Sequence, residues 1–281
     1  MKTRTLIIST FLCALVLVTP VWGNDGDNAK GPWEKFGVNA GVFVSSTDSN
    51  LKIGSGVGVY LDVENFLGLD TTNQVARIDA LWRFSDNRRH RVDLSWFAFR
   101  RSGDRVITEN ITIEGPDGEP IDINSGSTVS SFFNLDIYEL AYSYSFFQDD
   151  RIDLAVSAGA FVMPIDFGIQ STGVVDEEGS QKFTAPLPAF GLRMDFAITP
   201  KWFIRSGAKF FYLEYESFKG RLIEVKGAIE YAPWKNFGVG LGFDTFGMTL
   251  SAEGEDYPEI DLRGSGEFKY TGLQLYLRYF F

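Results

Sequence analysis

Hydrophobic and polar residues alternate along most of the chain between Phe36 and Phe281. In the segment 138–146, every second residue is aromatic or leucine, and the residues between them are small or acidic. A period of two residues is the period of a β-strand. Similar segments recur between turns rich in Asp, Asn, Gly, Pro and Ser, and no segment has the pattern of a long helix. The pattern therefore predicts a single all-β domain.

The number of strands depends on how the first alternating segments are divided. Counting back from Phe281 gives ten strands, the first of them at 51–61, and an eleventh at 36–45 would leave the two chain ends on opposite sides. Bacterial membrane barrels have an even number of strands. Either 36–61 is one long strand with a bulge, or a further strand lies within 62–73. We predict an antiparallel up-and-down barrel of ten strands, with twelve as the alternative.

Two kinds of connection alternate along the chain. Tight turns lie at 85–89, 148–150, 199–201 and 233–236, and longer, mostly acidic segments lie at 102–130, 164–185 and 247–266, with a shorter one near 215–220. Short turns on one side and long loops on the other are typical of a transmembrane barrel whose turns are periplasmic. The longest loop contains a Gly-Pro-Asp-Gly-Glu-Pro turn at 115–120, which predicts a hairpin that extends the barrel wall.

The last strand of the chain carries a feature of its own. Its alternate residues are apolar and end on a phenylalanine: Leu273, Leu275, Leu277, Tyr279 and Phe281. This pattern resembles the closing strand of bacterial outer-membrane barrels, in which it is the signal for assembly. The resemblance implies an outer-membrane location. It also implies two kinds of partner, namely the barrel-assembly machinery and the surrounding lipid and lipopolysaccharide.

Three internal stretches, 61–69, 89–95 and 137–144, also resemble a group of uncharacterised Gram-negative outer-membrane barrels. The resemblance covers most of the chain after the first 23 residues. It implies a fold and a location, and it carries no assigned activity.

The N-terminus has the pattern of a secretory signal peptide. Lys2 and Arg4 precede an apolar run of about 13 residues, which is too short for a transmembrane helix of about 20 residues. We predict that residues 1–23 are the signal peptide and that residues 24–281 form the barrel domain. The only cysteine, Cys13, lies in the apolar run, so the mature chain is expected to have no disulfide.

Charged residues lie on the polar faces of the predicted strands, which face the lumen of a membrane barrel. Eight are basic and eight are acidic: Arg77, Arg83, Arg91, Arg193, Arg205, Lys209, Lys226 and Arg278, with Asp79, Asp93, Glu139, Asp153, Asp195, Glu224, Glu230 and Asp244. A pore lined by one sign of charge selects solutes, whereas a balanced set favours mutual pairing. We therefore expect a lumen plugged by ion pairs, in a barrel with a structural or surface-interaction role. A narrow channel for small solutes is the alternative.

Glycines lie at alternate positions on one predicted strand, at Gly238, Gly240 and Gly242. Glycine in a strand commonly marks a close approach of another group. We expect a bulky neighbour, such as Phe203 or Tyr276, to occupy the space they leave, and a pore-lining face is the alternative.

Little in the sequence indicates catalysis. The only histidine, His90, follows a predicted periplasmic turn and is flanked by arginines, whereas triad chemistry needs a base beside a nucleophile. A lipid- or peptide-modifying enzyme is the third alternative, and we predict no enzymatic activity, no cofactor and no metal site. The formal net charge of −11 argues against nucleic acid as a partner.

Overall fold

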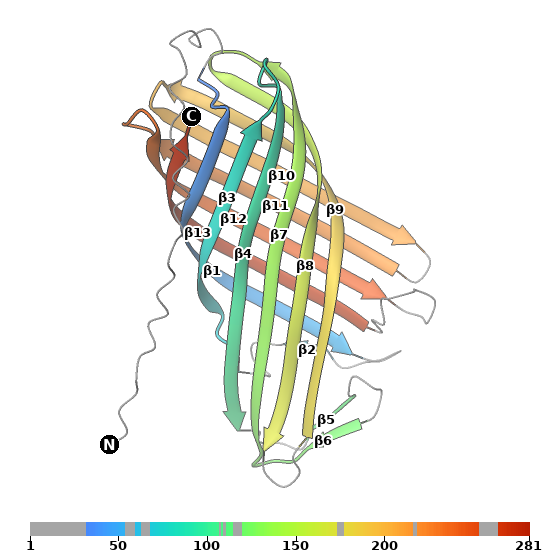
Figure 1. Cartoon of the computed structure of the whole chain (residues 1–281). Coiled ribbons are helices and arrows are strands. Elements are labelled where there is room, and N and C mark those ends of the chain that lie inside the picture. The colour runs from blue at the N-terminus through green and yellow to red at the C-terminus, as the bar shows by residue number, and fades with distance from the viewer. Residues whose placement is uncertain are drawn as a thin grey trace, which may run out of the picture.

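The computed structural model describes residues 32–53, 60–62, 68–106, 108, 111–114, 120–172, 177–215, 218–252 and 264–281. Ten antiparallel strands form a closed barrel (Figure 1). They are β1 (Phe36–Ile53), β3 (Thr72–Arg83), β4 (His90–Val106), β7 (Thr128–Gln148), β8 (Ile152–Thr172), β9 (Glu177–Thr199), β10 (Trp202–Tyr215), β11 (Phe218–Tyr231), β12 (Phe237–Ala252) and β13 (Gly264–Phe280). The predicted ten-stranded barrel is confirmed.

The barrel closes where its first and last strands pair. β1 and β13 are antiparallel neighbours from Gly37↔Phe280 to Ile53↔Gly264. The first strand of the barrel is β1, which runs without interruption through 36–53. The predictions of a first strand at 51–61 and of one bulged strand over 36–61 were therefore wrong in their bounds, because residues 60–62 form the separate strand β2, which pairs back on residues 50–52 of β1. The prediction for residues 1–23 lies outside the described residues. Within the described ranges, no helix is long and apolar enough to cross a bilayer.

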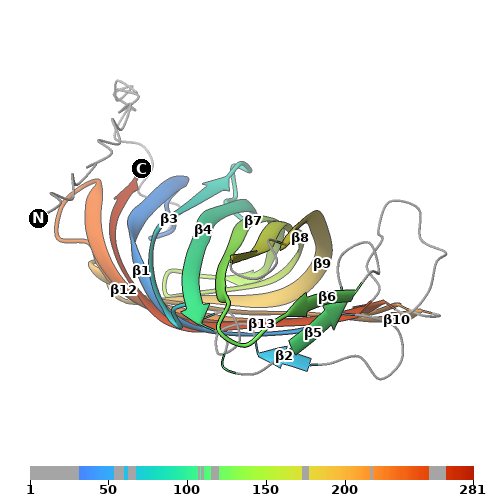
Figure 2. The same ribbon diagram turned by 90° about the horizontal axis from the view of Figure 1, so that it is seen from below.

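Three short strands lie outside the ten-strand order. β2 (Tyr60–Asp62) pairs with the end of β1, while β5 (Ile111–Glu114) and β6 (Pro120–Ile123) pair with each other. This pair is the hairpin that the sequence predicts, although residues 115–119 of its turn lie outside the described ranges. Figure 2 views the barrel from the end that carries this hairpin, with the strands curving around the interior.

Several strands continue far beyond the length that a membrane needs. β7 and β8 have 21 residues each and β9 has 23, which at ~3.3 Å per residue is roughly 70 Å. About ten residues suffice for a tilted membrane-spanning strand. Much of 102–130 and 164–185, and the flanks of 247–266, are therefore strand, and the prediction of loops there was wrong in extent.

The sequence of these extensions explains why they were predicted as loops. Where these strands continue, polar residues face outward as well as inward, so that the alternation is lost. Ser130 on β7, for example, donates a hydrogen bond of 2.6 Å to Asp104 on β4, on the outer surface.

The barrel has two distinct ends. We call the end with the tight turns and Phe281 the turn end, and the end with the hairpin β5–β6 the extended end (Figure 1). Between them the outer face is apolar, and Leu273, Leu275 and Leu277 on β13 are 59–68% exposed. Aromatic rings, such as the stacked pair Trp202–Tyr231 at 4.5 Å, lie near the turn end. An outward apolar band with an aromatic border matches a surface that faces lipid.

Candidate functional site

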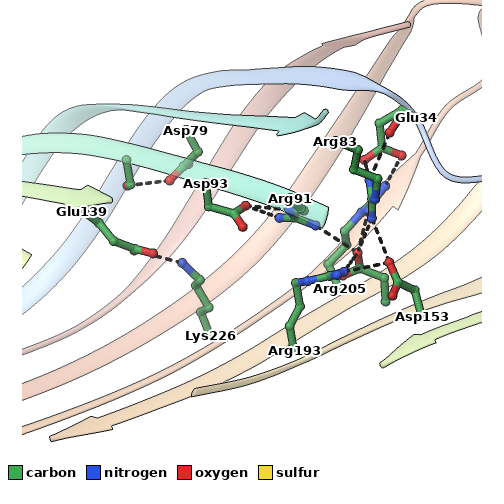
Figure 3. Close-up of polar contacts among 12 residues, drawn as sticks. Glu34, Asp79, Arg83, Arg91, Asp93, Glu139, Asp153, Arg193, Arg205 and Lys226 are labelled. Atoms are coloured by element: carbon green, nitrogen blue, oxygen red, sulfur yellow. Dashed lines mark hydrogen bonds and ion pairs between the residues drawn. The ribbon is translucent and has the colours of Figure 1, made fainter. Parts of the chain in front are cut away.

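Charged side chains fill the interior at the turn end, in a group that we call the turn-end layer. It comprises five arginines and five acids: Arg83, Arg91, Arg193, Arg205 and Arg278, with Glu34, Asp93, Asp153, Asp195 and Glu230. Some of these pairs join strands that are not neighbours in the barrel (Figure 3). Arg83 on β3, for instance, donates to Asp153 on β8 at 3.0 Å and to Asp195 on β9 at 3.2 Å. Ion pairs therefore tie the wall of the barrel together across its interior.

One member of this layer comes from outside the strands. Glu34 precedes β1 and accepts hydrogen bonds from Arg278 at 2.6 Å, from Arg205 at 3.1 Å and from Arg83 at 3.2 Å. Burial favours a raised pKa for the Glu34 carboxyl, but these three guanidinium groups together hold that pKa well below its usual range. Glu34 is therefore ionised in the interior. Its negative charge makes the number of acids in the turn-end layer equal to the number of arginines.

The neighbouring Trp33 holds this segment in place. Its side chain is 1% exposed and packs on Ala197 and Phe203, and its indole N–H donates to the carbonyl of Asp149 at 2.7 Å. Arg88 in the first tight turn donates to the carbonyl of Trp33. The segment of Trp33 and Glu34 therefore packs inside the lumen at the turn end.

A second charged group, the middle layer, lies further into the barrel. It comprises three bases and four acids: Arg77, Lys209 and Lys226, with Asp79, Glu139, Glu224 and Asp244. Lys209 on β10 donates to Glu139 on β7, which is not a neighbouring strand, and to Glu224 on the adjacent β11 at 2.8 Å. Arg77 on β3 donates to Asp244 on β12 at 2.6 Å. The pairs Lys209–Glu139 and Arg77–Asp244 therefore also cross the lumen, whereas Lys209 and Glu224 lie on adjacent strands.

Beyond the middle layer the interior becomes apolar. Each of the ten barrel strands contributes to this apolar layer, and sixteen of its residues are buried: Phe43, Phe97, Phe99, Leu135, Ile137, Phe161, Met163, Ile165, Leu187, Ala189, Leu222, Phe246, Met248, Leu250, Phe268 and Tyr270. Its rings form a continuous chain across the lumen. Phe97 lies 5.7 Å from Tyr270, Tyr270 lies 5.2 Å from Phe246, and Phe246 lies 5.6 Å from Phe161.

A cavity of about 150 Å³ remains among the charged side chains. Both charged layers contribute to its lining, including Asp79, Glu139, Lys226 and Asp244. Charged and polar groups lie among apolar ones in its lining, and it is roomy enough for several waters. No cluster of three or more His, Cys, Asp or Glu side chains is arranged to hold a metal ion within the described ranges.

The absence of a side chain at Gly240 on β12 leaves space for a tyrosine, as expected from the sequence. A Cβ on Gly240 would lie 2.2 Å from the ring of Tyr276. The ring therefore lies over β12, and its hydroxyl donates to Glu230 on β11 at 2.8 Å. The other expected neighbour, Phe203, packs with Trp33 instead.

The structure places all sixteen charged residues singled out in the sequence on the inner face, each in at least one ion pair. Figure 3 labels some of them, among them Asp79, Arg83 and Lys226. The assembly-pattern residues lie on the outer face of β13 and just beyond it, and Phe281 is 53% exposed. His90 lies at the turn end, where its Nδ1 is 2.7 Å from the Tyr142 hydroxyl and its ring lies beside Phe84 and Tyr144. It belongs to the aromatic border.

Two parts of the interior are missing from the sequence prediction. Glu34 and Trp33 lie outside any alternating segment, and their partners are up to 244 residues away. The apolar layer is missing because its strands have apolar residues on both faces. In β4, for example, Trp96, Phe97, Ala98 and Phe99 follow one another, and such a run does not indicate which residues face inward.

No protein-family model matches the sequence, and no curated protein is significantly similar to it. Solved structures do match. The outer-membrane protease OmpT from Escherichia coli is 12% identical, with 87% of this chain and 97% of that chain covered and a TM-score of 0.51. Ail, the attachment invasion locus protein of Yersinia pestis, is 8% identical over 88% and 100% of the two chains, with a TM-score of 0.33. The P. putida toluene transporter TodX is 7% identical over 87% and 89%, with a TM-score of 0.32.

The first of these similarities shows a shared fold, and the other two are too distant to carry an argument. The resemblance to Gram-negative outer-membrane barrels is thereby confirmed at the level of fold.

Proposed function

We propose that this ten-stranded barrel, which has the fold of a bacterial outer-membrane protein, is a non-conducting structural barrel with a surface-interaction role. Its turn end faces the periplasm, and its extended end projects from the cell surface. The apolar outer face supports lipid and lipopolysaccharide as its surroundings. The outer face of β13 supports recognition by the barrel-assembly machinery.

The observation that carries this proposal is the filling of the lumen. An ion moving along the barrel axis meets ion pairs that span the lumen and then the apolar layer. The apolar layer is the stronger barrier, since hydrophobic constrictions exclude water and ions even where the backbone is wide. The chain of rings from Phe97 to Phe161 lies directly across the path. A structural role therefore fits the interior better than the alternative of a narrow solute channel.

Conductance in planar bilayers tests this proposal. We expect the full-length protein to give no stepwise current in potassium chloride, because neither charged layer opens without leaving buried charges unpaired. Electrophoresis of the same reconstituted sample with and without boiling supplies the control, since a folded barrel changes mobility on heating. Discrete current steps from the heat-modifiable protein would support the channel alternative and overturn the proposal.

The proposed orientation can be tested by cysteine labelling. Ser125, between β6 and β7, is exposed at the extended end, and Asp86 is exposed in the first tight turn. We expect a membrane-impermeant maleimide to label S125C on intact cells. The matched variant D86C should become labelled only after the outer membrane is permeabilised. The reverse pattern would contradict the orientation.

The proposal includes no enzymatic role. The similarity to a protease shows a fold alone, and His90, the chain's only histidine, contacts Phe84, Tyr142 and Tyr144 at the turn end. This aromatic environment supports an interfacial position. The Nδ1 atom of the His90 ring contacts the Tyr142 hydroxyl at 2.7 Å, and the Ser85 hydroxyl accepts a hydrogen bond from the backbone N–H of His90 at 3.1 Å and not from its ring.

A further inference from the structure

The two charged layers differ in their balance of charge. The turn-end layer has five arginines and five acids, so that its formal charges cancel. The middle layer has three bases, Arg77, Lys209 and Lys226, and four acids, Asp79, Glu139, Glu224 and Asp244. One carboxylate of the middle layer therefore has no protein cation to balance it, in a part of the barrel where unbalanced charge is costly.

Asp244 is the acid that bears this excess. Its Oδ2 accepts from Arg77 at 2.6 Å and from the Tyr270 hydroxyl at 3.4 Å. The positive charge of Arg77 is shared between two acids, because its Nε also donates to Asp79 at 3.1 Å. The other carboxylate oxygen of Asp244, Oδ1, is buried and has no hydrogen-bond partner among the described residues, in a side chain that is 4% exposed. A buried, partnerless carboxylate oxygen loses its hydration without compensation.

The cavity of about 150 Å³ adjoins this carboxylate. Asp244, Asp79 and Glu139 line it, together with the amide of Gln274. Gln274 Nε2 donates to Asp79 at 3.2 Å, and the amide also carries an oxygen that can act as a ligand. The cavity therefore combines the three things that a hard cation needs, namely space for the ion with its waters, oxygen ligands and uncompensated negative charge.

We propose that the middle layer binds one monovalent metal cation, Na⁺ or K⁺, in this cavity, with Asp244 as its anionic ligand. The valence follows from the count of four acids against three bases, since a divalent ion would leave the layer with a net positive charge. Lys226 and Arg77 line the same cavity, and Arg77 contacts only Oδ2 of Asp244, which leaves Oδ1 for the ion. This site goes beyond the proposed structural role and does not depend on conduction through the lumen.

Thermal unfolding in different salts tests the site. The full chain, folded in detergent, is heated in sodium, potassium and N-methylglucamine chlorides of equal ionic strength, and the heat-modifiable fraction is measured. Binding to the folded state alone raises stability as ligand concentration rises. We expect a higher unfolding midpoint in sodium or potassium than in the bulky organic cation, with a difference that grows with salt concentration.

Two variants locate the effect. D244N keeps an oxygen for Arg77 but removes the excess charge, so its midpoint should be the same in all three salts. D136N changes an acid that is paired with Arg100 away from the lumen, and it should keep the difference between the salts. Loss of the difference in D136N as well would show a general salt effect and overturn the site.

A binding measurement on the unmodified protein tests the site even if the D244N variant fails to fold. We expect ²³Na magnetic resonance to show line broadening by the folded protein, which potassium reverses by competition. Equal midpoints in the three salts without such broadening would overturn the proposal. The excess charge would then be neutralised by a proton on Asp244.

Discussion

Replacing Gly41 by alanine is expected to stop the barrel from closing. Gly41 faces inward on β1, opposite Tyr276 on β13. A Cβ at this position would lie 2.1 Å from the carbonyl oxygen of Leu275 and 2.6 Å from the Cα of Tyr276. Both atoms belong to the backbone of β13, so no side-chain rotation relieves the clash. The two strands must separate at the seam, at a cost of more than about 3 kcal/mol.

The measurement is the folded, heat-modifiable fraction in outer-membrane preparations, which should fall to a small part of the wild-type level. Gly207 supplies the matched control, because it also faces inward and a Cβ there would lie 3.5 Å from its nearest neighbour. Since alanine restricts the unfolded chain more than glycine does, G207A should be neutral or stabilising by roughly 0.5 kcal/mol. Equal behaviour of G41A and G207A would refute the close approach at the seam.

Replacing Arg83 by methionine is expected to destabilise the folded barrel by about 3 kcal/mol. Arg83 is fully buried and donates to Glu34, Asp153 and Asp195. Methionine fills part of the volume but leaves one buried negative charge in excess, which is the costly outcome when one partner of a buried pair is removed. The expected cost is at the low end of the range for removing one partner of a buried ion pair, because Arg193 still pairs with Asp153 and Asp195.

Urea unfolding of the reconstituted protein, followed by tryptophan fluorescence, measures this cost. The control R100M removes an arginine whose side chain is 53% exposed and which pairs with Asp136, so it should cost no more than about 1 kcal/mol. The double variant R83M/D153N restores the balance of charge and should recover part of the loss. If R83M were as mild as R100M, the turn-end layer would have little part in stability.

The strand alternation was sufficient to predict the architecture and the direction of most side chains. It placed Arg77, Glu139 and Asp244 on the same inner surface although they lie on β3, β7 and β12, because a period of two assigns each residue of a strand to one face. Alternation does not say which charges meet across the lumen. The pairing of Lys209 with Glu139, or of Arg77 with Asp244, depends on the tilt of the strands around the barrel.

The parts that could not be predicted have different physical causes. Glu34 makes its contacts through a segment with no periodicity, so that only the closed barrel reveals its three arginine partners. Phe97, for example, lies between Trp96 and Ala98, which are on the opposite face of the strand and are also apolar or aromatic. A lipid-facing residue and one packed inside the barrel then look alike in sequence, since both environments favour the same side chains.

The contact of Tyr276 with Glu230 across Gly240 has a consequence for how the last strand finds its register. Sliding one strand by a single residue exchanges its inner and outer faces, and the hydrophobic pattern penalises that error. Sliding by two residues keeps every side chain on its own face, so the hydrophobic pattern does not penalise that error. Such a slip places Gly238 or Gly242 opposite Tyr276 in place of Gly240, and neither has a side chain. Only Gly240 lies opposite Glu230 on β11, whereas Gly242 lies opposite Ala228. The Tyr276 hydroxyl, together with Arg278 on the same strand, thus distinguishes the native alignment from slips that the strand period cannot detect.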